Sequence, residues 1–327
     1  MFRTASLTRF AVAAALIPLF AAQPAFAWGR DGHMMINELA AAALPTTVPD
    51  FLRDKAALEE MAYLGPEPDR WKQYDAEPEL VVTQSPDHFI DIEWAYLAAD
   101  TCTDGKDCVD GHRLPRRRYD FIRALAKAQA AHPEMAKLTP EGVGMLPWQV
   151  EEVWQRLKSA MRGYRELKEQ HKETKPVEEA ILFYAGWLGH YVADGSQPLH
   201  ATIQFNGWTG ENPNHYTTEH HIHSQFESTF VSNNIKMKDL TPLVAAAQPH
   251  VINDEWVEVM QYLDHTNSLV EKTYQLEKAG GFTDSGTAEA KAFTEERMAA
   301  GAIELRDLIY SAWVHSADPV KAYNGPQ

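Results

Sequence analysis

The segment 177–194 constrains the fold of this chain more than any other part of the sequence. It is strongly apolar, and we expect it to form a buried central helix. His190 and Asp194 stand four positions apart in it, hence on one helix face about one turn apart, and both would point toward the interior. Taken alone, this pair is as compatible with a hydrogen-bonded pair in the core as with a metal site.

Helical patterns dominate the rest of the chain as well. Residues 147–172 predict a long amphipathic helix with Val153 and Leu157 in its apolar stripe. Further helices are expected over residues 33–44, 51–64, 117–131, 223–231, 254–280 and 287–316. A short strand is expected at 80–83, and loops are expected over 65–87, 101–115 and 206–218. Without an internal repeat or a low-complexity linker, the sequence predicts an all-α fold, a single-domain helical bundle over residues 28–327.

The first 27 residues have the features of a secretion signal. A basic start precedes an apolar run over residues 10–20, and a small-x-small cleavage site ends at Ala27. We therefore expect a mature chain of 300 residues that begins at Trp28 and is periplasmic or secreted. No later apolar run has membrane-spanning length, so we expect no stable membrane anchoring.

Charge and cysteine usage limit the chemistry open to the mature chain. The net charge is −16, or −18 once Arg3 and Arg9 are removed, which argues against sequence-independent nucleic-acid binding by the surface at large. A phosphate substrate must then be attracted by a local positive site. The two cysteines, Cys102 and Cys108, lie in one polar stretch, and we expect them to form a loop disulfide in an oxidising compartment.

A second histidine–carboxylate pair favours a metal site over a simple core pair. His223 and Glu227 repeat the four-residue spacing at an expected helix start, and His200 follows the proline that ends the first helix. Imidazole and carboxylate together suit zinc, and two helices carrying such pairs can close a site in a bundle. His215 and Glu219 have the same spacing and compete for this role.

Four upstream residues extend the set of candidate ligands. Asp69 and His88 lie in expected loops, where such residues are commonly ordinary surface groups. His33 follows Trp28 by five positions, and the main-chain amine and carbonyl of Trp28 can ligate a metal only if cleavage creates that terminus at one defined place. The resulting nine residues are too many for a single zinc ion.

With these residues in this order, the chain resembles the trinuclear zinc nucleases, the S-one/P-one single-strand-specific nucleases of fungi, plants and bacteria. The zinc-dependent phospholipase C of bacilli is a more distant relative in the same superfamily. The resemblance spans nearly all of the mature chain. It is carried by Trp28, His33, Asp69, the block from His88 to Asp91, the block His190-x3-Asp194-x5-His200 with its Gln197-Pro198-Leu199-His200 segment, and His223-x3-Glu227.

The resemblance implies three zinc ions in a helical bundle. The first would be held by Asp69, His88, His190 and Asp194. The second would be held by the Trp28 amine and carbonyl, by His33 and by Asp194, which would bridge it to the first. The third would be held by His200, His223 and Glu227. Such a cluster would be a strongly positive spot in an acidic protein.

The resemblance also implies a function. It is that of a hydrolase, an exported zinc-dependent phosphodiesterase that releases 5′-mononucleotides from single-stranded DNA or RNA, with 3′-nucleotidase activity. We expect the protein to be a monomer. Asp69 and Asp194 would be catalytic carboxylates, and Lys72 would add positive charge near the phosphate. Phe89 and Asp91 match positions that stack on and hydrogen-bond a nucleobase, which is accessible only in single strands. Their plainer interpretation is core packing and a partner for a metal-bound histidine.

Departures from the nuclease pattern keep other functions open. Glu227 stands where the nucleases usually have aspartate and the phospholipase has glutamate, Lys72 replaces an arginine, and Asn206-Gly-Trp-Thr-Gly-Glu replaces a Gly-Gly-Asn segment. The segment 101–174 is longer than in compact members of the family. The alternative is a zinc-dependent phospholipase C acting on phosphatidylcholine-type lipids. A lesser alternative is a non-catalytic periplasmic zinc-binding protein.

Overall fold

The computed structural model describes residues 28–73, 75–99, 114–131 and 133–320. The expected signal segment 1–27 lies outside these ranges, and so do Cys102 and Cys108. Signal cleavage and the loop disulfide therefore stay predictions. No helix in the described ranges combines the length and the apolar character that crossing a membrane requires.

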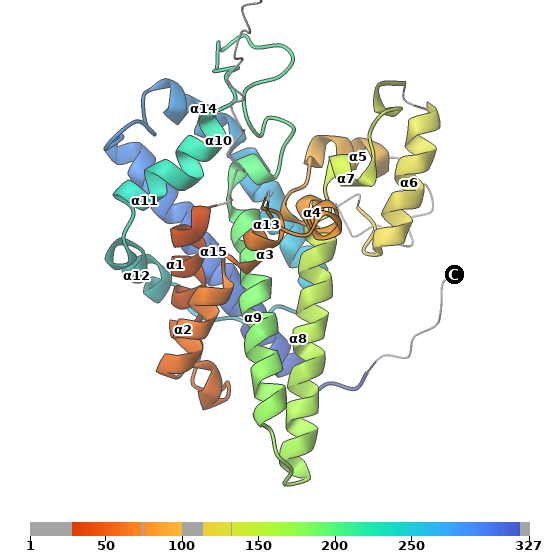
Figure 1. Cartoon of the computed structure of the whole chain (residues 1–327), viewed down its shortest axis with the longest axis vertical. Coiled ribbons are helices and arrows are strands. Elements are labelled where there is room, and N and C mark those ends of the chain that lie inside the picture. Colours follow the sequence, from red (N-terminus) through yellow and green to blue (C-terminus); the bar gives the residue numbers. More distant parts are fainter. Residues whose placement is uncertain (1–27, 74, 100–113, 132, 321–327) are drawn as a thin grey trace, which may run out of the picture.

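Long helices form the framework of the molecule. They are α1 (Gly29–Ala42), α2 (Lys55–Leu64), α8 (Leu146–Glu169), α9 (Lys175–Ser196) and α15 (Ala288–His315). Helices α8 and α9 make a long hairpin that reaches one end of the molecule, with α15 behind it and α1 and α2 beside α9 (Figure 1). Within the described ranges there is no β-structure beyond isolated bridges, so the expected all-α fold is confirmed.

Shorter helices surround this framework. The N-terminal half contributes α3 (Glu67–Trp71), α4 (Pro78–Gln84), α5 (Ile92–Ala99), α6 (Arg118–Ala131) and α7 (Pro140–Val143). The C-terminal half adds α10 (Ile222–Ser224), α11 (Val231–Asn234), α12 (Met237–Ala246), α13 (Glu255–Ser268) and α14 (Val270–Lys278). Short 3-10 helices cover Asp50–Leu52, Ser85–His88, Pro133–Met135 and Pro198–His200, and a π-helical turn covers Gln225–Phe230.

Small residues let α9 approach α1 and α2 closely. A Cβ atom added at Gly186 would lie 2.5 Å from Leu64 Cβ, and one added at Gly189 would lie 2.2 Å from Asn37 Oδ1. Asn37 is fully buried and donates hydrogen bonds to the carbonyl oxygens of Met61 and Gly186. This close contact fixes the three helices relative to one another, and with them the His and Asp side chains that they carry.

The buried apolar side chains form two clusters. One is centred on α8 and α9 and includes Trp154 and Leu188, whereas the other includes Trp28 and Phe226. Helices α9 and α15 contribute to both clusters, since Leu305 belongs to the first and Met298 to the second. The clusters are therefore joined by continuous helices into one bundle.

Three expectations about secondary structure are wrong. The expected strand at 80–83 is part of α4, which has proline in its first turn, a position where proline favours a helix. The expected loop 65–87 accordingly contains α3, α4 and a 3-10 turn. The expected helix 254–280 is two helices, α13 and α14, which meet at Leu269, where the amide bonds to Thr266 rather than continuing the α-helical pattern.

Glu304 on α15 makes stability depend on pH. Burial raises the pKa of this carboxyl to about 8, with further contributions from Glu258 and Asp307, and its Oε1 makes no hydrogen bond within the described residues. The folded state thus holds the Glu304 proton more tightly than the unfolded state. The contribution of this proton to the free energy of unfolding is fully present below the pKa that Glu304 has in the unfolded chain, and it is lost as pH rises toward 8. At pH 7 the loss is on the order of 3 kcal/mol.

We expect Glu304→Gln to raise the free energy of unfolding by up to about 3 kcal/mol near pH 8, because the amide needs no proton to stay neutral in the core. Near pH 5 the gain should be smaller than about 1 kcal/mol. Denaturant unfolding of both proteins at the two pH values checks this. An equal effect of the substitution at both pH values would contradict it.

Candidate metal centre

The buried end of α9 brings His190 and Asp194 together with His33 of α1. His33 Nε2 lies 3.4 Å from Asp194 Oδ1, and His190 Nε2 lies 3.3 Å from Asp194 Oδ2. The two imidazole rings stack with their centroids 4.0 Å apart. All three side chains are fully buried, and their ligand atoms lie close enough together to hold one metal ion.

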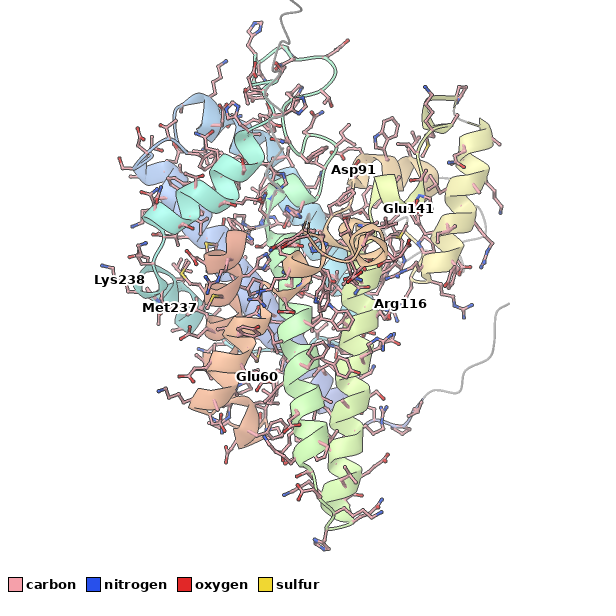
Figure 2. All side chains as sticks on the ribbon, viewed as in Figure 1. Glu60, Asp91, Arg116, Glu141, Met237 and Lys238 are labelled. Carbon is pink, nitrogen blue, oxygen red and sulfur yellow. The ribbon has the colours of Figure 1, made fainter. Side chains whose placement is uncertain are left out.

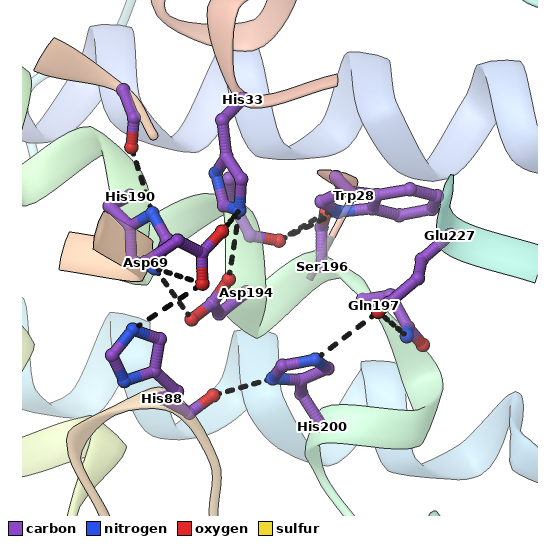
Figure 3. A network of polar contacts seen from close by, with 12 residues as sticks. Trp28, His33, Asp69, His88, His190, Asp194, Ser196, Gln197, His200 and Glu227 are labelled. Carbon is purple, nitrogen blue, oxygen red and sulfur yellow. Dashed lines mark hydrogen bonds and ion pairs between the residues drawn. The ribbon is translucent and has the colours of Figure 1, made fainter. Parts of the chain in front are cut away.

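A second group shares His190 with the first. Asp69 comes from α3 and His88 from the 3-10 turn Ser85–His88, and both are buried. Asp69 Oδ1 lies 3.8 Å from His88 Nε2 and 3.9 Å from His190 Nε2. Figure 3 shows these side chains pointing toward one another and toward Asp194. The three ligand atoms again lie within reach of a single ion.

The third group lies where α9 ends and the helix from α10 to α11 begins. Glu227 Oε2 lies 2.9 Å from His223 Nε2 and 3.5 Å from His200 Nε2. Gln197 donates a hydrogen bond to the same oxygen over 3.1 Å. Glu227 sits in the π-helical turn Gln225–Phe230, a distortion that is common at functional sites.

The histidines are held in one orientation by the main chain. Four of them place Nδ1 against a carbonyl oxygen: His88 on Gln84 at 2.8 Å, His190 on Gly65 at 2.8 Å, His200 on His88 at 2.6 Å and His223 on Phe205 at 2.9 Å. A carbonyl oxygen can only accept, so Nδ1 carries the hydrogen and Nε2 of the neutral ring presents a lone pair. This is the arrangement that orients metal-binding histidines.

The remaining polar atoms fit a set of cations. Within the described residues, neither oxygen of Asp194 makes a hydrogen bond, and the same holds for Nε2 of His88 and of His190. The Nε2 atoms of His200 and His223 are 3.0 Å apart, so two lone pairs would face each other. Buried groups of this kind cost free energy unless something positive lies between them. Nitrogen and carboxylate donors in such groups are typical of zinc sites.

Burial changes the proton affinities in the direction that ligation requires for the histidines. It lowers the pKa of His190 to about 4, although Asp69 acts against it, and it lowers the pKa of His88 well below its ordinary value. These rings are therefore neutral at pH 7, as ligands must be. Burial also raises the pKa of Asp69 and raises that of Asp194 to about 7, so in the absence of a cation these carboxylates are poorly stabilised as anions.

The pKa of Glu227 shifts in the opposite direction from those of Asp69 and Asp194. Burial by itself would raise the pKa of this carboxyl, but His223 and His200 more than offset that effect, and the net shift is downward. Burial likewise opposes protonation of His223, while the charge and hydrogen bond of Glu227 raise its pKa. The third group thus holds its carboxylate in the ionised form.

The three groups agree in part with the ligand sets that the resemblance implies. His200, His223 and Glu227 form one group as expected. His190 belongs to both of the other groups, and Asp194 lies with His33 rather than in the close group of Asp69. The competing pair His215 and Glu219 is exposed, and neither residue enters any ligand group within the described chain.

Trp28 is anchored beside the centre. Its indole is fully buried and donates to Ala193 O and to Ser196 Oγ, each at 2.8 Å (Figure 3). These acceptors flank Asp194 on α9. The carbonyl oxygen of Trp28 accepts a hydrogen bond from Gly32 at 3.1 Å, as the first carbonyl of α1. The backbone of Trp28 therefore begins the helix that carries His33, and ligation by its amine and carbonyl stays a prediction.

A cleft of about 430 Å³ opens onto the centre, a volume within the range of small-molecule sites. Its lining includes three candidate ligands, His88 of the second group and His200 and His223 of the third. The lining also contains Lys72, Phe89, Asp91 and Phe205. The candidate metal groups and the candidate base-binding residues therefore share one cavity.

Phe89 and Asp91 are held at the cleft by an extended segment of main chain. The Ile90 amide donates to His200 O at 2.9 Å and the Asp91 amide to Val143 O at 2.7 Å. Gly144 has a φ of 90°, and a Cβ atom there would lie 2.2 Å from Phe89 O, so only glycine permits this approach. Figures 1 and 2, drawn in the same view, show Asp91 in the region of α5 and α7. Both side chains are half-buried rather than packed in the core.

Two charged side chains at the cleft, Asp91 and Lys72, are affected by neighbouring groups. Burial raises the pKa of Asp91 to about 7, and Glu93 adds to the shift. Lys72 Nζ lies 3.2 Å from Asp69 Oδ1, so the candidate phosphate-binding cation is paired with a candidate ligand. Phe205, half exposed at the cleft, was not expected from the sequence, since nothing marks it beyond its place just before the 206–218 loop.

Comparisons with known proteins give matches among solved structures only. No family model and no curated protein matches the chain. Among solved structures, the chain is similar to the alpha-toxin of Clostridium perfringens from an avian strain, at 14% identity and a TM-score of 0.37, over 88% of this chain. The aligned region spans 64% of the toxin chain. A similarity this low assigns neither fold nor function, and the candidate site rests on its own geometry.

Proposed function

We propose that this chain is an exported, zinc-dependent phosphodiesterase that hydrolyses single-stranded DNA or RNA to 5′-mononucleotides and has 3′-nucleotidase activity. The observation that carries the proposal is the shared cavity. One cleft contains ligand atoms from two of the three buried groups together with Phe89, Asp91 and Lys72. A phosphate at the metal groups and a base against Phe89 can therefore occupy the cleft at the same time.

Different residues of the chain would bind the metal ions, orient the imidazoles and attract the phosphate. Bound zinc ions would supply Lewis acidity and a water that ionises near neutral pH. The buried His and Asp side chains hold the ions, and the main-chain carbonyls keep each imidazole in the ligating orientation. Lys72 places a positive charge at the cleft wall, where a phosphate oxygen would lie.

Strand preference follows from the aromatic side chain in the cleft. A base can stack on Phe89 only after it has left its neighbours, and in a duplex that step costs unpairing energy. Asp91 can accept a hydrogen bond from a base when ionised, and with a pKa of about 7 it can donate one when protonated. The proposal therefore predicts faster hydrolysis of single strands than of duplexes.

We expect Phe89→Ala to raise the KM for an oligonucleotide by about 10-fold to 100-fold, because stacking on one aromatic ring contributes about 1–3 kcal/mol. Bound zinc should not change, since Phe89 is in none of the ligand groups. Tyr119→Ala is the matched control, because Tyr119 is an exposed aromatic residue of α6 that is not among the residues lining the cleft. An unchanged KM for Phe89→Ala, measured by mononucleotide release, would remove Phe89 from the binding site.

A substrate panel tests the proposed function. The protein processed to Trp28 and loaded with zinc would be given single-stranded DNA, duplex DNA and phosphatidylcholine vesicles, with and without chelator. The proposal predicts chelator-sensitive release of mononucleotides, fastest from single strands. Hydrolysis of phosphatidylcholine alone would establish the phospholipase alternative, and tight zinc binding without hydrolysis of any of them would establish the binding-protein alternative.

A further inference from the structure

A second, smaller cleft also reaches the metal centre. It has a volume of about 200 Å³ and is lined by Arg30, Pro66, Asp69, Arg70 and Gln73. Asp69 is a candidate ligand, so this cleft ends at the second group. The remaining lining residues are absent from the cleft of Phe89, so the two cavities are separate.

The lining of the second cleft contains two arginines and one aspartate. Arg30 lies in the first turn of α1, is exposed, and forms no ion pair among the described residues. Arg70 forms an ion pair with Glu67 and lies over the Tyr63 ring at 4.6 Å, contacts that hold its side chain in place. Guanidinium groups match the geometry of phosphate oxygens, and an unpaired one at a cleft is available to bind them.

The two clefts meet at one ion pair. Lys72 lines the larger cleft and Asp69 the smaller one, and their charged atoms are 3.2 Å apart. Asp69 and its ion pair with Lys72 therefore separate the two cavities. A strand whose base lies against Phe89 and whose phosphodiester lies at the metal groups can continue past this pair toward Arg30.

We propose that the second cleft binds the next phosphate of the polynucleotide, beyond the phosphodiester that is hydrolysed. This inference rests on the proposed function and adds a preference for chain length to it. A dinucleoside monophosphate has its single phosphate at the metal groups and leaves the second cleft empty. A longer strand fills both clefts. Arg30 therefore contributes to the binding of the longer strand and not to that of the dinucleoside monophosphate.

The test compares Arg30→Ala with the unaltered protein, both processed to Trp28 and loaded with zinc. The probes are a phosphorothioate-linked dinucleoside monophosphate and a phosphorothioate single-stranded DNA hexamer, with binding measured by fluorescence titration. We expect hexamer binding to weaken about 5-fold to 20-fold and dinucleotide binding to stay the same. The slope of log affinity against log salt for the hexamer should become shallower by about 0.7, the value for one phosphate contact on a single strand.

Two further variants separate charge from structure. Arg30→Lys should keep most of the hexamer affinity, and Gln73→Glu should lower it as Arg30→Ala does, because it places a negative charge in the same cleft. Arg117→Ala is the matched control, since Arg117 is an exposed arginine that lines neither cleft. Melting temperatures of all variants would show that each is folded.

The outcomes distinguish this inference from the proposed function. Unchanged hexamer binding in Arg30→Ala, or equal losses for hexamer and dinucleotide, would overturn the inference while leaving a working nuclease. If the unaltered protein neither bound nor hydrolysed either oligomer, the proposed function would fall, and this inference would fall with it.

Discussion

Asp194→Asn should abolish hydrolysis, lowering kcat by at least about 1,000-fold, and should reduce the bound zinc. One oxygen of Asp194 lies 3.4 Å from His33 Nε2 and the other lies 3.3 Å from His190 Nε2. The carboxylate therefore contacts both histidines of the first group. An amide keeps the shape but loses the negative charge and one acceptor oxygen. Removing this ligand should therefore empty the site that the first group forms.

The same substitution should not harm the metal-free fold. Burial raises the pKa of Asp194 to about 7, so without metal the ionised side chain is unfavourable in its own pocket. A neutral amide avoids that cost, and the melting temperature of chelator-treated Asp194→Asn should equal or exceed that of the chelator-treated parent. Elemental analysis of zinc and thermal melts with and without chelator check both parts.

Asp91→Asn is the control for the zinc measurement, because it also neutralises a carboxylate near the cleft but lies in none of the ligand groups. It should retain the full zinc content. If Asp194→Asn also retained it, the carboxylate would be a core residue with no ligating role, and the assignment of the first group would be wrong.

The second large effect concerns the N-terminus. A protein that keeps one residue before Trp28 should bind less zinc and lose about 100-fold in kcat. The indole of Trp28 is fixed by hydrogen bonds to Ala193 and Ser196, so the main chain at Trp28 begins beside the segment that carries Asp194. The family resemblance implies that the amine of this residue is a ligand, and a peptide bond in its place has no lone pair to donate.

The matched comparison uses three proteins: one processed to Trp28, one that begins at Ala27, and one processed to Trp28 that carries a short C-terminal extension. The first and third should have equal zinc content and activity, and the second should have less of both. Full zinc content and activity in the protein that begins at Ala27 would show that the Trp28 amine is not a ligand.

Periodicity predicted the parts of the centre that lie within single helices. The spacing of four between His190 and Asp194, and between His223 and Glu227, places both members of each pair on one helix face, and local geometry alone determines that. The apolar segment 177–194 predicted α9, and the apolar stripe of residues 147–172 predicted α8. These features depend on neighbours in the sequence.

The parts that depend on distant contacts were not predictable. The sequence does not show that His200 donates to the carbonyl of His88, 112 positions away, or that this contact joins the third group to the second. The π-helical turn at Glu227 has no periodic signature, and the segment 80–83 is too short for its pattern to distinguish a strand from the helix α4. The position of Arg30 at a cleft depends on how α1 packs beside α3.

The most direct test of the metal-dependent phosphodiesterase is a zinc titration of the stripped, processed protein with single-stranded DNA as substrate. Bound zinc and mononucleotide release would be measured on the same samples. The structure and the proposed function together predict that zinc binds to three per chain and that activity rises steeply only as the last sites fill. Full activity in the stripped protein, or saturation with zinc without release of mononucleotides, would contradict the proposal.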